Sequence, residues 1–326
     1  RAGQPLFKVI DDGKLLAVMN VPVSAPRTIG TELSFRFAGH PDVVKGKVFE
    51  VSPRADHRSG TIEIKALIEG GELMSSSADD FIFPFFSTPG NQNPNYQLTV
   101  QYPDYYEYCF FANPTVLDPM KALDDPRIPR YFRANADGEY ISLEASEQGS
   151  VVLDEEVGKN PSKCTEAVFQ KGNLLRADSP DVICSYAETM FYVAEAYVRG
   201  LGVAKDMTQA DAAYRKGIEA SCVYNGVAAA TASTFAAGVP SLSTLGGEAK
   251  ALEAIASQQR IEMMMRPLEA WSNQRRTGYP ALEVPASIRN FYPGIMHRWP
   301  YPEREGSVND NVPHVDGVWT KMWFEN

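Results

Sequence analysis

The spacing of apolar residues changes character once along this 326-residue chain, at the polar run Ser75-Ser76-Ser77. Before this run, short segments alternate apolar and polar side chains, as half-buried β-strands do. After it, apolar residues recur every three or four positions in several segments, as in amphipathic helices. The chain is therefore predicted to be multi-domain α+β, with a β region over residues 1–74, a seam at 75–78 and a helix-containing region beyond.

The β region holds five strand-like segments, at residues 5–10, 14–21, 33–37, 46–51 and 61–68. Asp11-Asp12-Gly13, between the first two, is a hairpin-type turn signal. Short strands that follow one another with turn residues between them are typical of small closed sheets. We therefore expect a small antiparallel β-barrel.

The second region divides into a loop-rich part at residues 79–180 and a helical part at residues 181–326. The loop-rich part is rich in Pro, Asn, Asp and aromatic residues, and long irregular stretches in folded domains are usually functional. The helical part is expected to begin at residue 181, because Ser179 can cap a helix and Pro180 suits its first turn.

Two of the predicted helices form a pair. The first ends at Gly200, and the second covers residues 208–221 with Ala210, Ala213 and Gly217 on its inner face. Small residues at this spacing let two helices approach closely, so we expect a tetratricopeptide-like helical hairpin. Two more helices are predicted, at residues 248–265 and 267–277.

Charge and cysteine usage limit the classes of partner and site. The net charge is −10, and it is uneven: residues 1–74 carry 10 Lys+Arg and 9 Asp+Glu, which leaves 21 and 32 for the remainder. Such an acidic chain is a poor partner for nucleic acid. The cysteines (Cys109, Cys164, Cys184 and Cys222) form no C-x-x-C pair, so isolated thiols are favoured and a disulfide stays open.

Motifs of catalysis are missing from the sequence. It holds no G-x-S-x-G elbow, no P-loop and no H-E-x-x-H, and its four histidines lack ligand spacing. Glu188 and Glu195 lie seven residues apart on one helix face, which allows an acid/base pair. A structural use of these carboxylates is the favoured interpretation. We expect no enzyme activity, no cofactor and no metal site.

The β region resembles the β-barrel domain of periplasmic adaptor (membrane-fusion) proteins of efflux pumps. The resemblance is carried by residues 3–7, 29–33, 45–56 and 59–61. The turn that normally closes the barrel in that family is replaced here by residues 71–76. This resemblance implies an alternative function, a structural component of an efflux or secretion system in the periplasm.

Residues 79–326 resemble the SusD/RagB outer-membrane nutrient-binding lipoproteins, in their SusD-like second branch. The stretches that carry this resemblance are residues 124–132, 185–200, 258–262, 269–280, 298–305 and 319–323, with Asn309 and Asn311. Within them lie the residues that we take as its structural signature: Asp125, Arg127, Glu188, Glu195, Glu262, Trp271, Arg275, Arg276, Arg298 and Glu303. Of these, Trp271 is expected in the core, and Arg275 and Arg276 in ion pairs that fix helix ends.

This resemblance implies non-catalytic capture of a glycan or peptide ligand at the cell surface, with a TonB-dependent outer-membrane transporter as the partner. Family members carry a lipid-anchored cysteine and an N-terminal half that have no counterpart in the sequence. This favours a truncated chain or a joined reading frame over a natural fusion, and a truncated or fused chain with no independent activity is a further alternative.

Ligand contacts are predicted in the loop-rich part, where tyrosines crowd together. Tyr102, Tyr105, Tyr106 and Tyr108 precede Phe110 and Phe111. Exposed aromatic rings stack on the apolar faces of sugars, and their hydroxyl groups bond polar groups. The alternative is that these rings fill space between loop and helices.

Overall fold

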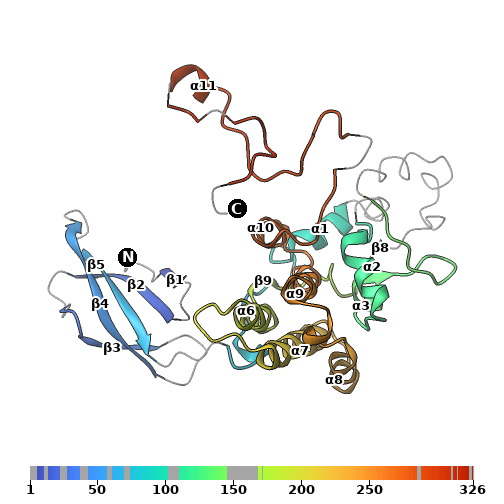
Figure 1. The fold of residues 1–326 in the computed structure, drawn as a ribbon, viewed down its shortest axis with the longest axis horizontal. Coiled ribbons are helices and arrows are strands. Elements are labelled where there is room, and N and C mark those ends of the chain that lie inside the picture. Colours follow the sequence, from blue (N-terminus) through green and yellow to red (C-terminus); the bar gives the residue numbers. More distant parts are fainter. Residues whose placement is uncertain are drawn as a thin grey trace. The chain divides into compact units, whose positions relative to one another are not determined.

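The computed structural model describes residues 6–10, 14–22, 28–36, 43–56, 61–69, 74–101, 110–144, 168–170, 172–284, 288–309, 311–313, 315–322 and 325. The chain forms two compact units. Residues 1–75 and 199–206 make the first, and residues 76–198 and 207–326 make the second. The first unit contains a β-sheet, and the second is built mainly of helices (Figure 1).

The first unit contains one antiparallel sheet with the strand order β1-β2-β5-β4-β3. Its strands are β1 (Leu6–Ile10), β2 (Lys14–Pro22), β3 (Glu32–Arg36), β4 (Val43–Asp56) and β5 (Thr61–Glu69). All five predicted strands are thus confirmed. The alternation of apolar and polar residues was enough to predict these strands. β1 pairs with β2 and β3 with β4 across short connections, and β5 pairs with both β2 and β4.

The predicted barrel is not confirmed. β1 and β3 lie at opposite edges of the strand order, and no pairing joins them among the described residues. The register of β4 against β5 shifts twice, between Val48 and Glu50 and between Val51 and Ala55. Pro53 falls in the second shift, the kind of position at which a strand tolerates a residue without an N–H. Bulges of this kind bend a long strand, but among the described residues they do not bring β1 and β3 into pairing.

The second unit combines helices with two short antiparallel strand pairs. The strand pairs are β6 (Phe81–Phe83) with β9 (Asp181–Cys184), and β7 (Phe132–Arg133) with β8 (Val168–Phe169). The helices are α1 (Pro94–Gln101), α2 (Pro114–Ala122), α3 (Ile128–Tyr131), α6 (Tyr186–Arg199), α7 (Met207–Tyr224), α8 (Ala229–Gly238), α9 (Glu248–Glu262), α10 (Pro267–Thr277) and α11 (Glu305–Val308), with 3-10 turns η1 (Ser77–Asp79) and η4 (Leu242–Thr244). None of the described helices has both the length and the apolar character needed to cross a membrane.

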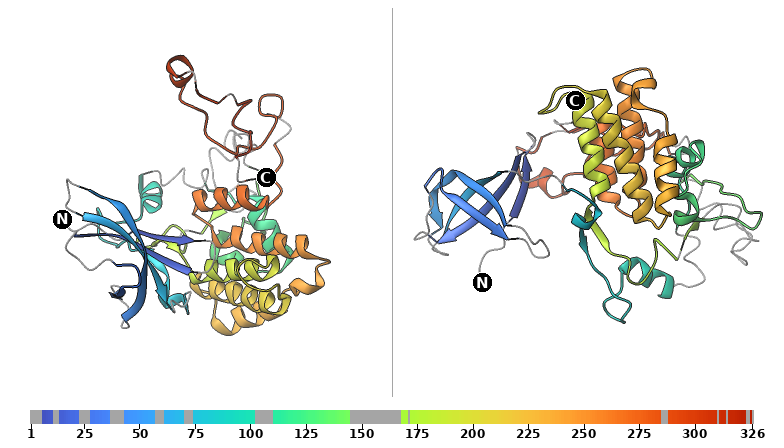
Figure 2. Two further views of the ribbon diagram at one scale, coloured as in Figure 1. Left: turned by 60° about the vertical axis from the view of Figure 1, so that its left-hand side comes forward. Right: turned by 90° about the horizontal axis from the view of Figure 1, so that it is seen from below.

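The helices from α6 to α10 lie side by side in the second unit (Figure 2). The main core forms between α6, α7, α8 and α9. The predicted hairpin is confirmed, and its small residues have the expected use. A Cβ on Gly217 would lie 2.7 Å from the Phe191 ring, so glycine lets α7 come close to α6. Phe191 itself is fully buried.

The predicted start of the first helix is wrong. Residues 181–184 form strand β9, and α6 begins only at Tyr186. Ser185, not Ser179, is the capping residue, since its hydroxyl oxygen accepts a hydrogen bond from the Glu188 N–H at 3.0 Å. The carboxylate of Asp80 accepts another from the Tyr186 N–H at 2.6 Å. The strand is stabilised by its pairing with β6, about a hundred residues earlier in the chain, which a local pattern does not reveal.

A smaller core lies between α2, α3, β7 and the end of α9. Leu117, Met120, Phe132 and Ile261 are completely buried there. The loop-rich part of the chain is therefore attached to the helical stack through packed apolar side chains. Of the cysteines, Cys184 and Cys222 are free thiols, and Cys109 and Cys164 lie outside the described residues.

Candidate ligand-binding site

Arg127 and Asp125 form a buried ion pair that ties three parts of the second unit together. The Arg127 Nη2 lies 2.6 Å from the Asp125 Oδ2 and donates to the Gln258 Oε1 at 2.7 Å. Its Nη1 donates to the Ser221 Oγ at 2.8 Å. Burial lowers the pKa of Arg127, but the Asp125 carboxylate more than offsets this and raises it overall. Arg127 therefore stays charged, and the pair joins the α2–α3 connection to α7 and α9.

Glu188 and Glu195 share a face of α6, as predicted, and each is paired with an arginine. The Glu188 Oε2 lies 2.7 Å from the Arg266 Nη2. Glu195 receives two hydrogen bonds from Arg276, at 2.7 and 2.8 Å. Because both carboxylates are held by guanidinium groups, they brace α6 against α10 and against the residue that directly precedes it.

Arg275 connects α10 to the C-terminal segment, by which we mean residues 288–325. Its Nε donates to the Glu325 Oε1 at 2.5 Å, and the Nδ1 of His297 lies 2.8 Å from the Glu325 Oε2. Burial raises the pKa of Glu325, but hydrogen bonding and these positive neighbours outweigh it and lower that pKa overall. The carboxylate is therefore a stable anchor for the segment.

Trp271 is half-buried and does not lie in the core as expected. The Arg275 guanidinium lies 4.4 Å from its ring centroid, and its indole Nε1 donates to the Met296 carbonyl at 3.0 Å. Its ring centroid lies 6.5 Å from that of Trp299, with the planes at 70°. We call Trp271 and Trp299 the aromatic pair. The indole N–H of Trp271 needed a polar partner, and the C-terminal segment supplies it at the surface.

Trp299 presents most of its ring to solvent, with 68% of its surface exposed. The same segment exposes Phe291, Tyr292 and Tyr301, and the Arg298 guanidinium lies 4.5 Å from the Tyr301 ring centroid. Glu303 is exposed as well. Exposed aromatic groups of this density, beside charged side chains, are more typical of a ligand-binding surface than of an inert one.

The backbone that carries Trp299 is fixed by packing around Trp319. The amides of His297 and Arg298 both donate to the Val318 carbonyl, at 2.8 and 3.1 Å. A Cβ on Gly294 would lie 2.7 Å from the Trp319 Cβ, so the chain passes too close for any other residue. The aromatic pair is thus held in place by a folded segment.

The predicted ligand-binding tyrosines, Tyr102, Tyr105, Tyr106 and Tyr108, lie outside the described residues. The chain is described again from Phe110, whose ring centroid lies 5.4 Å from that of Phe169. Phe110, Phe111 and Phe169 line a pocket of about 310 Å³ together with methionines and Arg260. Burial lowers the pKa of Arg260.

Sequence reasoning missed Arg266 and Glu325, which bind the predicted signature residues Glu188 and Arg275. Each stands in an ordinary polar pattern, and its partner lies far away in the chain, so no local signal distinguishes it. Asn273, which accepts a hydrogen bond from Arg276, was noted only within the stretch at residues 269–280. Trp299 was noted only as part of the resemblance. Among the described residues, no group of three His, Cys, Asp or Glu side chains is placed to hold a metal ion.

Comparisons with known proteins agree on one family. The SusD-like_2 family model, described as "Starch-binding associating with outer membrane", matches residues 49–302. A SusD homologue from Bacteroides fragilis is similar in structure, with 24% identity, a TM-score of 0.61 and coverage of 79% of this chain and 60% of that one. None of the curated proteins compared matches the chain.

Two further solved structures have the same fold. A second SusD homologue from Bacteroides fragilis has 20% identity and a TM-score of 0.58, and the match covers 79% of this chain and 59% of that one. A chitin-binding SusD homologue from Flavobacterium johnsoniae has 19% identity and a TM-score of 0.51, with 79% and 56% covered. The chain spans about 60% of the length of the first of these structures.

Proposed function

The chain belongs to the SusD-like family, and we propose that it is a non-catalytic binding protein for glycan or peptide nutrients. The description of the family as starch-binding and the printed function of the Flavobacterium johnsoniae homologue, chitin binding, support a glycan as the first ligand to test. Asp125, Glu188 and Glu195 are each paired with an arginine, and this structural use of three signature carboxylates supports a binding role.

The aromatic pair is the observation that carries this proposal. The Trp299 ring is exposed and rests edge-on against Trp271, which is itself held by Arg275 and by the Met296 carbonyl. A flat ring held in place can stack on the apolar face of a sugar with little loss of side-chain entropy. Arg298 lies next to it in the chain and can bond the hydroxyl groups of the same ligand.

The tyrosine cluster is a second proposed contact surface. Tyr102, Tyr105, Tyr106 and Tyr108 are proposed to stack on ligand groups as the aromatic pair does. A peptide ligand would use the same surfaces through its apolar side chains. Because these tyrosines and Trp299 belong to segments far apart in sequence, they can be varied independently.

The proposed place of action is the outer membrane, at the cell surface, with a TonB-dependent transporter as the partner. The association of the family with the outer membrane supports this location. The periplasmic-adaptor alternative is not favoured. The family match begins at residue 49, inside β4, so it includes part of the sheet on which that alternative depends.

Binding of the full-length chain to soluble starch and to chitin oligosaccharides, followed by calorimetry, tests the proposal. We expect Trp299→Ala to weaken binding by about tenfold or more, as loss of a stacked aromatic ring does. Phe86→Ala is the matched control, since Phe86 is an aromatic side chain 57% exposed outside the C-terminal segment. Equal affinities of the parent and Trp299→Ala for every glycan that binds would overturn the assignment of the aromatic pair.

A further inference from the structure

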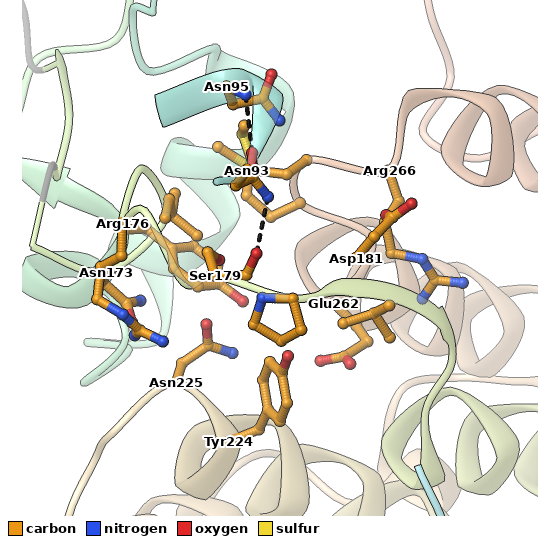
Figure 3. A pocket seen from close by; sticks show the side chains of 16 residues that line it. Asn93, Asn95, Asn173, Arg176, Ser179, Asp181, Tyr224, Asn225, Glu262 and Arg266 are labelled. Atoms are coloured by element: carbon orange, nitrogen blue, oxygen red, sulfur yellow. Dashed lines mark hydrogen bonds between the residues drawn. The ribbon is translucent and has the colours of Figure 1, made fainter. Parts of the chain in front are cut away.

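A polar pocket of about 200 Å³ lies in the second unit, and none of its lining residues belongs to the C-terminal segment. Figure 3 shows Tyr224 and Glu262 pointing toward one another from the end of α7 and the end of α9. Asn173 and Arg176 face them from the loop that leads to β9. Four amides, Asn93, Asn95, Asn173 and Asn225, are among the lining side chains.

The pocket contains buried polar atoms without partners. The Asn173 Nδ2 and two nitrogens of Arg266 (Nε and Nη1) form no hydrogen bond with any described residue, and the Glu262 Oε2 has none of ordinary geometry, although the nearby Ser221 hydroxyl acts to lower the pKa of Glu262. These three residues are only 8%, 8% and 5% exposed, respectively. Buried donors and acceptors are nearly always satisfied, because each unmet one costs free energy. Three such residues around one cavity indicate that a bound molecule completes them.

The charges around the pocket favour a neutral ligand. Two arginines act on Glu262, and each has a carboxylate partner of its own: Arg266 has Glu188 at 2.7 Å, and Arg127 has Asp125 at 2.6 Å. An amino acid would place its carboxylate near Arg266, where it would compete with Glu188. A hydroxyl group has no such conflict, because it both donates and accepts.

We propose that this pocket binds one sugar ring or a small polyol of similar size. Neighbouring hydroxyl groups of such a molecule can donate to the Glu262 Oε2 and accept from Asn173. The half-exposed Tyr224 ring and Pro180 supply an apolar wall. The volume equals that of about seven water molecules, which suits a single ring and excludes a chain of several. This site is separate from the aromatic pair and does not depend on it.

Titration of the full-length chain with methyl glycosides tests this site. The probes are methyl glycosides of glucose, galactose, mannose and N-acetylglucosamine, with glycine and alanine as zwitterionic comparisons, and binding is followed by ligand-observed NMR. At least one glycoside is expected to saturate the chain with a millimolar Kd. Tyr224→Phe and Asn173→Ala each remove one polar contact and are expected to weaken that binding about three- to tenfold.

Tyr140→Phe is the matched control, because it also removes one phenol hydroxyl but lies outside the pocket, and its Kd should equal that of the parent. Circular dichroism melting confirms that the variants fold. The proposal is overturned if no glycoside saturates, which would mean that ordered water alone fills the pocket. It is equally overturned if the pocket variants bind like the parent, or if glycine and alanine bind in place of the glycosides. Polysaccharide binding through Trp299 is measured separately, so either proposal can fail alone.

Discussion

Two buried clusters of charged side chains lie along α9, and they differ in how completely their polar atoms are bonded. Arg127 is surrounded by Asp125, Gln258 and Ser221, and every one of its side-chain nitrogens has a partner. Glu262, the last residue of α9, and Arg266, which directly precedes α10, keep atoms without a partner of ordinary hydrogen-bond geometry although they are almost as buried. Buried arginine and carboxylate side chains are thus fully bonded in one cluster and incompletely bonded in the other.

The difference follows from what surrounds each cluster. The Arg127 cluster is enclosed by three parts of the chain that each contribute a partner, so it works as a closed brace. The cluster of Glu262 and Arg266 borders the polar pocket, and some of its side-chain atoms have no partner of ordinary hydrogen-bond geometry among the described residues. A brace is expected to tolerate no loss of a member, whereas an open cluster should be less sensitive, since part of its bonding is missing already.

Arg127→Met tests the brace and should give the largest effect on stability. It leaves the Asp125 carboxylate buried without its counter-ion, which typically costs about 3–5 kcal/mol. The free energy of unfolding in urea measures this loss. The double variant Arg127→Met with Asp125→Leu removes both charges and should recover the larger part of the lost free energy of unfolding. A loss below about 1 kcal/mol for the single variant would contradict the brace.

Arg266→Met tests the open cluster and should cost less, about 2–3 kcal/mol. It removes the arginine partner of Glu188, whose carboxylate then keeps, among the described residues, the Tyr192 hydroxyl at 3.1 Å. However, it also removes two buried nitrogens, Nε and Nη1, that have no hydrogen-bond partner among the described residues, and their loss is favourable. The free energies of unfolding of Arg266→Met and Arg127→Met, both measured in urea, show which substitution costs more. Equal losses would show that the two clusters do not differ.

The sequence predicts elements whose signals are local. Residues 267–277 form a helix as expected, because Pro267 suits its first turn and Gly278 ends it with φ of +78°. The strands of the first unit are predicted from the alternation of apolar and polar residues, which is also a local signal. The strand at residues 181–184 could not be predicted in this way, since its stability depends on pairing with β6.

The candidate sites depend even more on distant partners. The spacing of Glu188 and Glu195 shows that they share a face, but nothing in the spacing identifies Arg266 or Arg276 as their partners, 78 and 81 residues later. The half-buried position of Trp271 depends on the Met296 carbonyl, 25 residues away. Long-range pairs of this kind are visible only once the helices are placed.

Ser221→Ala tests the link between the clusters and should cost about 1–2 kcal/mol. The Ser221 hydroxyl is fully buried and accepts from the Arg127 Nη1, which the variant leaves without that partner. Ser272→Ala, at an exposed position of α10, is the matched control and should change stability by less than about 0.5 kcal/mol. Both are measured by urea unfolding. If Ser221→Ala also stays below that value, the hydroxyl is not part of the brace.

Glu262→Gln gives the smallest effect and the one that depends on pH. Burial raises the pKa of Glu262 above its ordinary value of 4.5, and the neighbouring hydroxyls of Ser221 and Ser185 counteract this only in part. The folded chain therefore holds this proton more tightly than the unfolded chain. Its contribution to stability is complete below pH 4.5 and is lost as the pH rises through the folded-state pKa.

Glutamine keeps the hydrogen bond from the Ser185 hydroxyl and cannot ionise. The free energy of unfolding of the parent minus that of Glu262→Gln should therefore decrease as the pH rises above 4.5, and level off above the folded-state pKa. Each tenfold difference in proton affinity between the folded and unfolded states contributes about 1.4 kcal/mol to this decrease. Urea unfolding of both proteins across the acidic and neutral range measures it. If the free energies of unfolding of the two proteins run parallel with pH, Glu262 has the same pKa in the folded and unfolded states. A carboxylate with all of its hydrogen bonds made would behave in this way. The contrast with the Arg127 brace would then disappear.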